Sequence, residues 1–457
     1  MASPADPVAN NLDIARHIVT LATRGGASQC DAILVAYDES EVTVRLGETE
    51  RLMESGSRSL GLRVILGGRT AICSTSDLSE ESVERLARET VELAAISAPD
   101  EYSGLPDPAL LATRGADGMG LFDEEVESLS REEKIRMARD CEAGAFAFDP
   151  RITNSDGASV GTRSRDVVLV NSHGFAGSYR STNISLTVEV MADDADGKKR
   201  NAYWFSQARA LHRLQDAQEV GRIAARRAVD QIGARKMATI EVPVVFEPIM
   251  AARLMGIAAS AALGTSLYRG TTFLAGRQGE LIGSPLVTIV DNPLEPGAGG
   301  SRPFDGEGVA TKQTSIFEHG RFTGFLFDCY TGRRTGNQTT GSASRGVDSG
   351  PSPGSSNLIW SPGEMLAADV VGGVKNGFYL TALMGFGFNP NTGDFSNGAA
   401  GFWIEDGKLA YPVTEVNVSG RLDRMFADVD AVGDDLEWFG SAAAPTVRIA
   451  KMTVSGT

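Results

Sequence analysis

Histidine and cysteine are scarce in this sequence of 457 residues, which has only four of each. No histidine lies three to five positions from another, and no two cysteines form a C-x-x-C pair. Zinc sites depend on such spacings, so the sequence contains no recognisable metal site. The residues concerned are His17, His173, His212, His319, Cys30, Cys73, Cys141 and Cys329. Isolated cysteines are typical of a cytoplasmic protein with reduced thiols.

The sequence also lacks a long apolar run and an excess of basic charge. Its longest apolar stretch, around residues 254–263, is too short to cross a bilayer, which takes about 20 residues. The N-terminus MASPADPVANN has no basic-then-apolar signal. With 59 acidic and 43 basic residues the net charge is −16, and no basic cluster reverses it locally. We therefore expect a cytoplasmic protein with no membrane segment and no direct contact with nucleic acid.

Motifs for phosphate binding and for a serine nucleophile are equally poorly represented. No P-loop, G-x-G-x-x-G or S-x-x-K pattern occurs. Two G-x-S-x-G strings occur, at 157–161 and 350–354, but that motif works only at a sharp strand-to-helix turn. Ser159 lies between strand-like segments and Ser352 between two prolines, so chance in a chain with 52 glycines explains both. An independent hydrolase that uses carboxylates or Ser159 stays open as an alternative.

The sequence does contain regular helix and strand patterns, in a chain long enough for two or three domains. A helix pattern covers residues 11–24 and ends at Gly25-Gly26. Gly67-Gly68 marks a two-residue hairpin turn, and an acidic helix begins at Ser79. The strands expected between the two helices are Ala32–Tyr37, Val42–Leu46, Leu60–Leu66 and Thr70–Ser74. These elements form a helix–sheet–helix unit over residues 1–97.

A second α+β unit is expected over residues 120–236, and with the first it makes the N-terminal domain. It opens with a capping box in which Glu133 faces Ser130, and its strands run from about residue 151 to residue 208. The larger third unit covers residues 237–457 and is mostly β. Its expected strands are Ile240–Phe246, Leu286–Val290, Gln313–Phe317, Phe322–Cys329, Phe402–Ile404, Lys408–Tyr411 and Thr446–Ile449.

Antiparallel sheets with segregated helices define an α+β protein, with N-terminal α/β/α units followed by a larger, mostly-β C-terminal domain. One helix of the third unit, residues 249–263 (IMAARLMGIAASAAL), is apolar nearly all round. Such a helix is buried either in the core of its own domain or against another subunit.

Charged residues gather in the glycine-rich blocks of the C-terminal half. Read functionally, they line a groove that holds the backbone and termini of a peptide, and four of them are the candidate groove residues. In the alternative interpretation they cap turns and pair with one another. The candidates are Arg302, Asp305, Arg345 and Asp394, accompanied by Asp291, Glu307, Glu405 and Glu415.

Four stretches together resemble the PmbA/TldD family, which is also called the "modulator of DNA gyrase" or microcin-processing peptidase family. They are residues 54–79 (ESGSRSLGLRVILGGRTAICSTSDLS), the block 270–308 that begins GTTFLAGRQGE, the stretch GFGFNPNTGDFSNGAAGFWIEDG from residue 385, and residues 432–456. The likeness covers nearly the whole chain and is greatest to the PmbA branch, also called TldE. It implies an α+β subunit of a cytoplasmic two-subunit peptidase.

Comparison with the family that the chain resembles also shows two places where this sequence differs from the family's pattern. A TldD-type subunit carries a His-Glu-x-x-x-His zinc motif on the helix of the third domain and a later cysteine ligand. Here Met255–Ser260 stands at the motif, and the cysteine-bearing loop is shortened to Gly440–Pro445. We therefore expect no catalytic residue, no metal ligand and no cofactor in this chain, and zinc in a TldD-like partner.

The partners implied by the resemblance are a TldD-like subunit, in a heterodimer, or a second copy of this chain, in a homodimer. The substrates implied are short or unfolded peptides. A homodimeric peptide-binding or regulatory protein without catalysis is the other alternative that the residues leave open.

Overall fold

The computed structural model describes residues 7–195 and 197–456. Its N-terminal part is one antiparallel sheet in the order β3-β2-β1-β4-β5-β6. Because β1 pairs with β2 on one side and β4 on the other, both N-terminal units share this sheet. The strands are β1 (Gln29–Arg45), β2 (Glu48–Leu66), β3 (Arg69–Thr75), β4 (Ile152–Asn171), β5 (Ala176–Asp193) and β6 (Lys199–Ala208).

Two pairs of helices pack on one face of this sheet. In β1 the alternate residues Cys30, Ala32 and Leu34 join the core beneath the first pair, whereas Val42 and Val44, on the same face, join the core beneath the second. The first pair is α1 (Pro7–Arg24) and α2 (Glu80–Ile96); the second is α4 (Arg131–Phe146) and α5 (Ala217–Val229). The short α3 (Glu124–Glu127) and the 3₁₀ turn Pro108–Leu110 lie between α2 and α4, and a second 3₁₀ turn, Leu211–Arg213, lies between β6 and α5.

Local sequence signals are confirmed in this domain. Gly67 and Gly68 have φ of 56° and 80° and turn β2 into β3, which a residue with a Cβ rarely allows. Ser130 and Glu133 form the expected capping box at the start of α4. The expected break between Ala32–Tyr37 and Val42–Leu46 is wrong, because β1 is continuous. Its polar middle lies between the two helix pairs, so the strand continues without an apolar partner there.

Five strands of the C-terminal domain close into a barrel. Each pairs with two neighbours in the ring β7-β14-β16-β17-β21, and only β7 and β14 run parallel. The ring strands are β7 (Ile240–Phe246), β14 (Asn376–Met384), β16 (Asp394–Glu405), β17 (Lys408–Arg421) and β21 (Val447–Ser455), with β15 (Phe388–Asn389) and β18 (Val429–Val432) at its margins.

A second sheet of short strands lies against the barrel, in the order β10-β9-β8-β13-β20-β19. Its strands are β8 (Ile289–Asp291), β9 (Thr314–Glu318), β10 (Arg321–Phe322), β13 (Leu358–Trp360), β19 (Glu437–Phe439) and β20 (Ala442–Ala444). The pair β11 (Ala343–Ser344) and β12 (Ser352–Pro353) is separate. The remaining helices are α6 (Pro248–Ala261), α7 (Gly264–Tyr268), α8 (Cys329–Thr335), α9 (Ala367–Gly372) and α10 (Leu422–Ala427).

The apolar helix α6 packs into the core of the C-terminal domain. Leu254 and Met255 are fully buried, and nine of its residues are buried in total. The expected strand Phe322–Cys329 is wrong beyond Phe322. Asp328 instead accepts a hydrogen bond from Thr331 N and caps α8, so a capping side chain overrides the apolar pattern before it.

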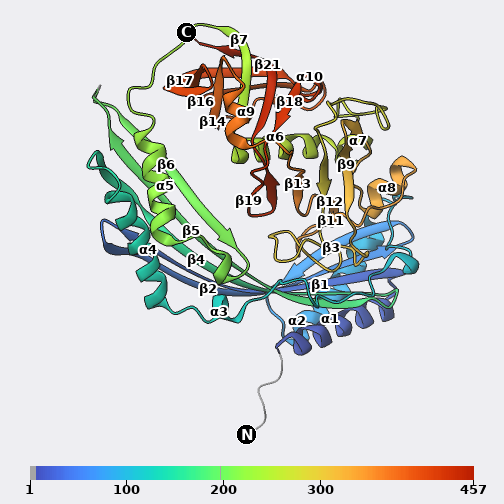
Figure 1. Cartoon of the computed structure of the whole chain (residues 1–457). Helices are drawn as coiled ribbons and strands as arrows, with labels where there is room; N and C mark the ends of the chain where they lie inside the picture. The colour runs from blue at the N-terminus through green and yellow to red at the C-terminus, as the bar shows by residue number, and fades with distance from the viewer. Residues whose placement is uncertain (1–6, 196, 457) are drawn as a thin grey trace.

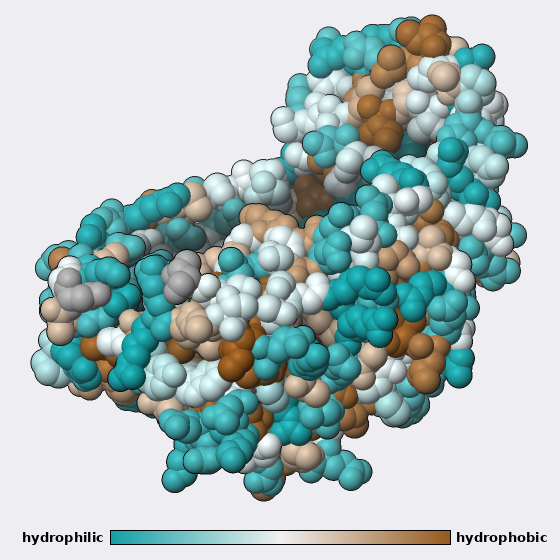
Figure 2. Space-filling view, turned by 90° about the horizontal axis from the view of Figure 1, so that it is seen from above, coloured by the Kyte–Doolittle hydropathy of each residue, from teal (hydrophilic) through white to brown (hydrophobic). Residues whose placement is uncertain are grey.

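The barrel domain lies on the inner side of the long curved sheet, and α1, α2 and α4 lie on its outer side (Figure 1). The protein is therefore α+β, with helices on one face of the first sheet and the second domain on the other. Hydrophilic residues cover most of the face seen in Figure 2, and the hydrophobic ones form separate small patches. No helix among the described residues is long and apolar enough to span a membrane.

Candidate functional site

The four residues expected to line a peptide groove do not lie together. Asp305 is 2% exposed and the Arg345 side chain 0%, because both lie inside the joint between the domains. Arg302 is half-buried near them and donates to Ser356 Oγ at 3.4 Å. Asp394 is exposed at the start of β16, where it accepts from Thr392 Oγ1 at 2.6 Å. Asp305 and Arg345 reach no surface in this arrangement, and a groove role for Arg302 and Asp394 stays a prediction.

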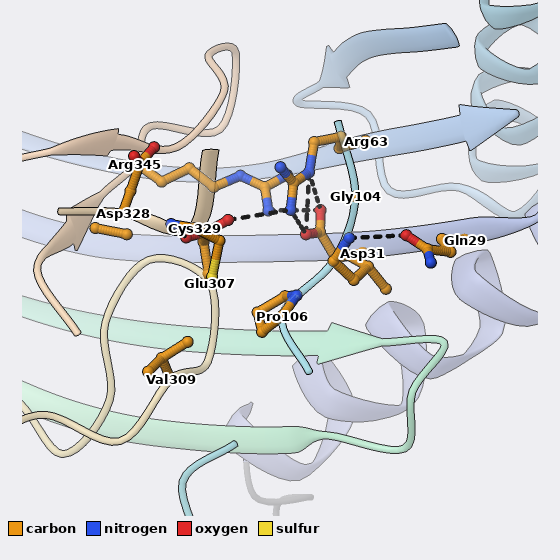
Figure 3. Close-up of polar contacts among 12 residues, drawn as sticks. Gln29, Asp31, Arg63, Gly104, Pro106, Glu307, Val309, Asp328, Cys329 and Arg345 are labelled. Carbon is orange, nitrogen blue, oxygen red and sulfur yellow. Dashed lines mark hydrogen bonds and ion pairs between the residues drawn. The ribbon is translucent and has the colours of Figure 1, made fainter. Parts of the chain in front are cut away.

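The joint is a buried ionic cluster (Figure 3). Asp31 of β1 accepts from Arg63 Nη2 of β2 at 2.5 Å and from Arg345 Nη1 of the C-terminal domain at 2.6 Å. Burial alone would raise the pKa of Asp31, but the charges of Arg345 and Arg63 outweigh it and lower that pKa. The cluster therefore fixes the C-terminal domain to the inner face of the N-terminal sheet.

Three further carboxylates lie on the C-terminal side of this ionic cluster. Asp305 caps its own turn, since it accepts from the backbone N–H of Glu307 at 2.9 Å and of Val309 at 3.0 Å. Glu307 accepts from the backbone N–H of Cys329 at 2.7 Å. Burial raises the pKa of Glu307 to about 7, and it also raises the pKa of Asp305 and of Asp328. These groups hold loops in place and share no surface with solvent.

A cavity of 940 Å³ lies elsewhere in the seam between the two domains. One wall is β6, the last strand of the N-terminal sheet, from Trp204 to Ala208. The opposite wall includes Glu437–Phe439, which is β19, the last strand of the second C-terminal sheet. The ring centroids of Trp204 and Phe439 are 6.2 Å apart across it. A concave site of this size, with apolar and polar lining, is the usual form of a ligand pocket. We call it the seam cavity.

Two arginines tie the domains together beside the seam cavity. Arg209 at the end of β6 is 8% exposed and donates to the carbonyls of Ala298 at 2.9 Å and Gly299 at 2.6 Å. Arg227 of α5 donates to both oxygens of Glu247, at 2.6 and 2.9 Å, where the chain enters α6. Burial raises the pKa of Glu247 although its bonds to Arg227 lower it. These charged contacts thus join the two domains on either side of the seam cavity.

The solvent-facing side of α6 does not fit a zinc ion. It presents Arg253, Gly256, Ile257 and Ser260, among which a hydroxyl is the only group that resembles a metal ligand. Met255 points into the core with no exposed surface. In the part of the chain that the structure describes, no three His, Cys, Asp or Glu side chains are grouped to hold a metal ion.

The loop that follows β19 is a tight hairpin. Gly440 has a φ of 66° and, with Ser441, turns β19 into β20. Gly440 also lines the seam cavity. The two places where the resemblance expects metal ligands, α6 and this hairpin, pack against each other through β20.

The two serines and two of the histidines considered in the sequence analysis lie in strands or turns, where their contacts are with neighbouring protein groups. Ser159 lies in the middle of β4, with its hydroxyl 2.8 Å from Thr43 Oγ1, and Ser352 lies in β12. Neither is at a strand-to-helix turn. His319 has a φ of 47° in the turn between β9 and β10. His173 contacts the carbonyl of Pro106 through Nδ1 at 2.9 Å.

Sequence reasoning missed the residues that build the seam cavity. Pro248 was recognisable as the first residue of a helix, and that places Glu247 at the N-cap. Nothing local in the sequence pairs Glu247 with Arg227 or sets Trp204 against Phe439, because these contacts join different domains.

The fold and the seam define a class of protein in which a helix-backed antiparallel sheet carries a barrel domain on its inner face. Three family profiles match in consecutive segments: PmbA/TldA metallopeptidase domain 1 over residues 30–94, the central domain over 124–232 and the C-terminal domain over 239–456. The chain belongs to the PmbA/TldD family of metallopeptidases.

Known proteins of similar sequence and structure support the same family assignment. The chain is 32% identical over 446 residues to "Metalloprotease PmbA" of Escherichia coli O157:H7, covering 97% of this chain and 96% of that protein. A solved structure described as a modulator of DNA gyrase from Bacteroides thetaiotaomicron is 28% identical, with a TM-score of 0.91 and full coverage of both chains. TldE from Thermococcus kodakarensis, at 21% identity and a TM-score of 0.87, shares the fold over 97% of this chain and 100% of that one.

Proposed function

We propose that this chain is a PmbA-type subunit of a two-subunit zinc metallopeptidase that cleaves short or unfolded peptides. In this proposal a TldD-like partner holds the zinc ion and the attacking water. This chain completes the heterodimer and helps to enclose the peptide. The complex acts in the cytoplasm, and the four unpaired cysteines fit a reducing compartment.

One observation carries the proposal: membership of a metallopeptidase family is combined with a helix α6 whose exposed face has no imidazole or carboxylate. A catalytic zinc site takes three protein ligands and keeps a fourth position for water. Gly256 and Ser260 supply none of these ligands. An apolar helix packed into the core is compatible with a subunit that was built without a metal site.

The proposal is tested by reconstitution with a TldD-like protein encoded in the same genome. Turnover of a short unstructured peptide is measured for this chain alone, for the partner alone and for the mixture. We expect turnover only in samples that contain the partner, with a gain when this chain is added. Turnover by this chain alone would contradict the proposal and favour an independent hydrolase. Binding of intact peptide with no turnover in any mixture would favour a homodimeric peptide-binding protein.

A second experiment distinguishes a role of this chain in assembly alone from a direct role of its residues in peptide turnover. Trp438 is 40% exposed and lines the seam cavity, whereas Leu93 is 44% exposed on α2, on the outer side of the sheet. Trp438→Ala and Leu93→Ala each remove a partly exposed large side chain, and the two differ in where that side chain lies. If this chain only completes the heterodimer, the two variants should give the same peptide turnover.

A further inference from the structure

A second cavity lies on the helix-covered face of the N-terminal sheet, opposite to the C-terminal domain. Its volume is 510 Å³, and ligand pockets usually hold about 300–1,000 Å³. Its floor is the polar middle of β1 with the neighbouring parts of β2 and β4, and its walls come from α3 and α4. In Figure 1, α3 lies under the sheet between α4 and the pair formed by α1 and α2. We call this space the helix-side cavity.

The floor of the helix-side cavity is made of polar side chains from neighbouring strands. Asp38 and Ser40 lie on the same face of β1 as Val42, which is buried beneath α4 and α5. Asp38 pairs with Ser164 of β4, and Ser40 pairs with Thr162. Cross-strand partners share a face of the sheet, so one carboxylate and three hydroxyls border the same space. In the described part of the chain, none of these three hydroxyls has a hydrogen-bond partner.

Lys134 brings a positive charge to this cavity from the first turn of α4. The residue lines the helix-side cavity and is only 4% exposed. Its Nζ forms no hydrogen bond and no ion pair with any residue that the structure describes. Burial lowers the pKa of Lys134, and the more distant charge of Glu54 acts in the opposite direction. Because a buried ammonium without a partner is costly, Lys134 favours the binding of a negatively charged group.

The carboxylates that line the helix-side cavity are not all free to bind a ligand. Three of them are already paired with arginines: Glu39 with Arg163, Glu54 with Arg131 at 3.0 Å, and Glu127 with Arg180 at 2.6 Å. The Asp38 carboxylate has no such partner among the described residues. A Cβ at Gly56 would lie 2.7 Å from Asp38 Oδ1, so the glycine leaves the room that this carboxylate occupies. The cavity thus contains one unpaired negative charge, on Asp38, and one unpaired positive charge, on Lys134.

We propose that the helix-side cavity binds a small zwitterion, an α-amino acid or a dipeptide, with its carboxylate on Lys134 and its ammonium on Asp38. The hydroxyls of Ser40, Thr162 and Ser164 can donate to or accept from the remaining polar groups of the ligand. This inference does not depend on the proposed function, because it concerns binding by this chain alone. Peptide cleavage would supply such ligands, since each product has an ammonium at one end and a carboxylate at the other.

The charges of the helix-side cavity disfavour simpler ligands. A metal ion would meet the ammonium of Lys134, and no three His, Cys, Asp or Glu side chains among the described residues are grouped to hold one. A phosphate ion would be repelled by Asp38, and a diamine would be repelled by Lys134. A ligand that carries both charges pairs both groups and leaves neither one uncompensated.

The first experiment compares ligands that differ only in their charged ends. L-Alanine and L-alanyl-L-alanine are titrated separately into the full-length chain in a calorimeter, and the tighter of the two identifies the size of the ligand. Each is also tested with an acetylated amino end and with an amidated carboxyl end. We expect every blocked form to bind at least about tenfold more weakly, because each lacks one charged hydrogen-bonding group. Absence of binding by both zwitterions, or equal binding of a blocked form, would overturn the proposal.

Substitutions locate the site. Lys134→Met removes the ammonium and keeps an apolar stem, and Asp38→Asn removes the charge and keeps the shape of the side chain. Lys408→Met is the matched control, since Lys408 is exposed on β17 in the other domain. We expect weakening of about tenfold or more for Lys134→Met and Asp38→Asn, and unchanged affinity for the control.

Unchanged affinity in Lys134→Met and Asp38→Asn, or an equal loss in Lys408→Met, would contradict this location of the site. Far-ultraviolet circular dichroism establishes that each variant is folded. If a variant does not fold, the blocked ligands still test the proposal on the wild-type chain.

Discussion

Arg345 and Asp31 lie 314 positions apart in the sequence, and Nη1 of the arginine lies 2.6 Å from Oδ1 of the aspartate inside the protein. Both side chains are almost without exposed surface. Arg63 holds the other carboxylate oxygen at 2.5 Å. This contact joins the first strand of the N-terminal sheet to the C-terminal domain.

Arg345→Met is expected to lower the free energy of unfolding by about 3–5 kcal/mol, because it leaves part of a buried carboxylate uncompensated. The measurement is urea unfolding followed by far-ultraviolet circular dichroism. Arg131→Met is the matched control, since Arg131 pairs with Glu54 at 3.0 Å with both side chains about half exposed. The control should cost less than about 1 kcal/mol. Equal effects of the two variants would show that the ionic cluster contributes no more than a surface pair.

Glu307 makes the stability of the ionic cluster depend on pH. Its pKa in the folded protein is raised to about 7 from an ordinary 4.5, mainly by burial. The folded state therefore binds more protons between these values, and its stabilisation is complete below about pH 4.5 and is lost as the pH rises through about 7. Glu307→Gln keeps an acceptor for Cys329 N without the titration. We expect wild type to lose stability relative to this variant over that window, as measured by thermal unfolding at each pH. A constant difference between the two proteins would contradict the assignment.

Alanine substitutions at two helical glycines are expected to have opposite effects on stability. A Cβ at Gly256 of α6 has no atom within 4 Å, so Gly256→Ala should stabilise the protein by about 0.5–1 kcal/mol through helix propensity. A Cβ at Gly221 of α5 would lie 1.9 Å from the carbonyl oxygen of Cys141 in α4. Gly221→Ala should therefore separate α4 from α5 and cost about 1–3 kcal/mol. Chemical denaturation measures both, and a destabilised Gly256→Ala protein would mean that the open face of α6 is packed.

The features that could be predicted from the sequence are those that depend on residues close together in the chain. The turn at Gly67-Gly68, the capping box of Ser130 with Glu133 and the apolar helix α6 all follow from short-range backbone and side-chain chemistry, and the structure contains each of them. The α+β class followed from the same signals.

Long-range contacts were beyond the reach of such signals. Charge and glycine context drew attention to Asp305 and Arg345, but their burial depends on Asp31 and Arg63 from the other domain. The polar middle of β1 suggested a break, because the gap between the helix pairs is visible only once the sheet is assembled. The seam cavity likewise exists only when β6 faces β19.

We propose above that this chain contributes to a zinc peptidase without binding zinc itself. The most direct test is to measure the metal content of the purified full-length chain after incubation with zinc and dialysis. Beside it runs a Gly256→His, Ser260→His variant, which places two imidazoles one helical turn apart on the open face of α6. We expect substoichiometric zinc in the wild-type chain and a gain in the variant. One tightly held zinc ion per wild-type chain would contradict it.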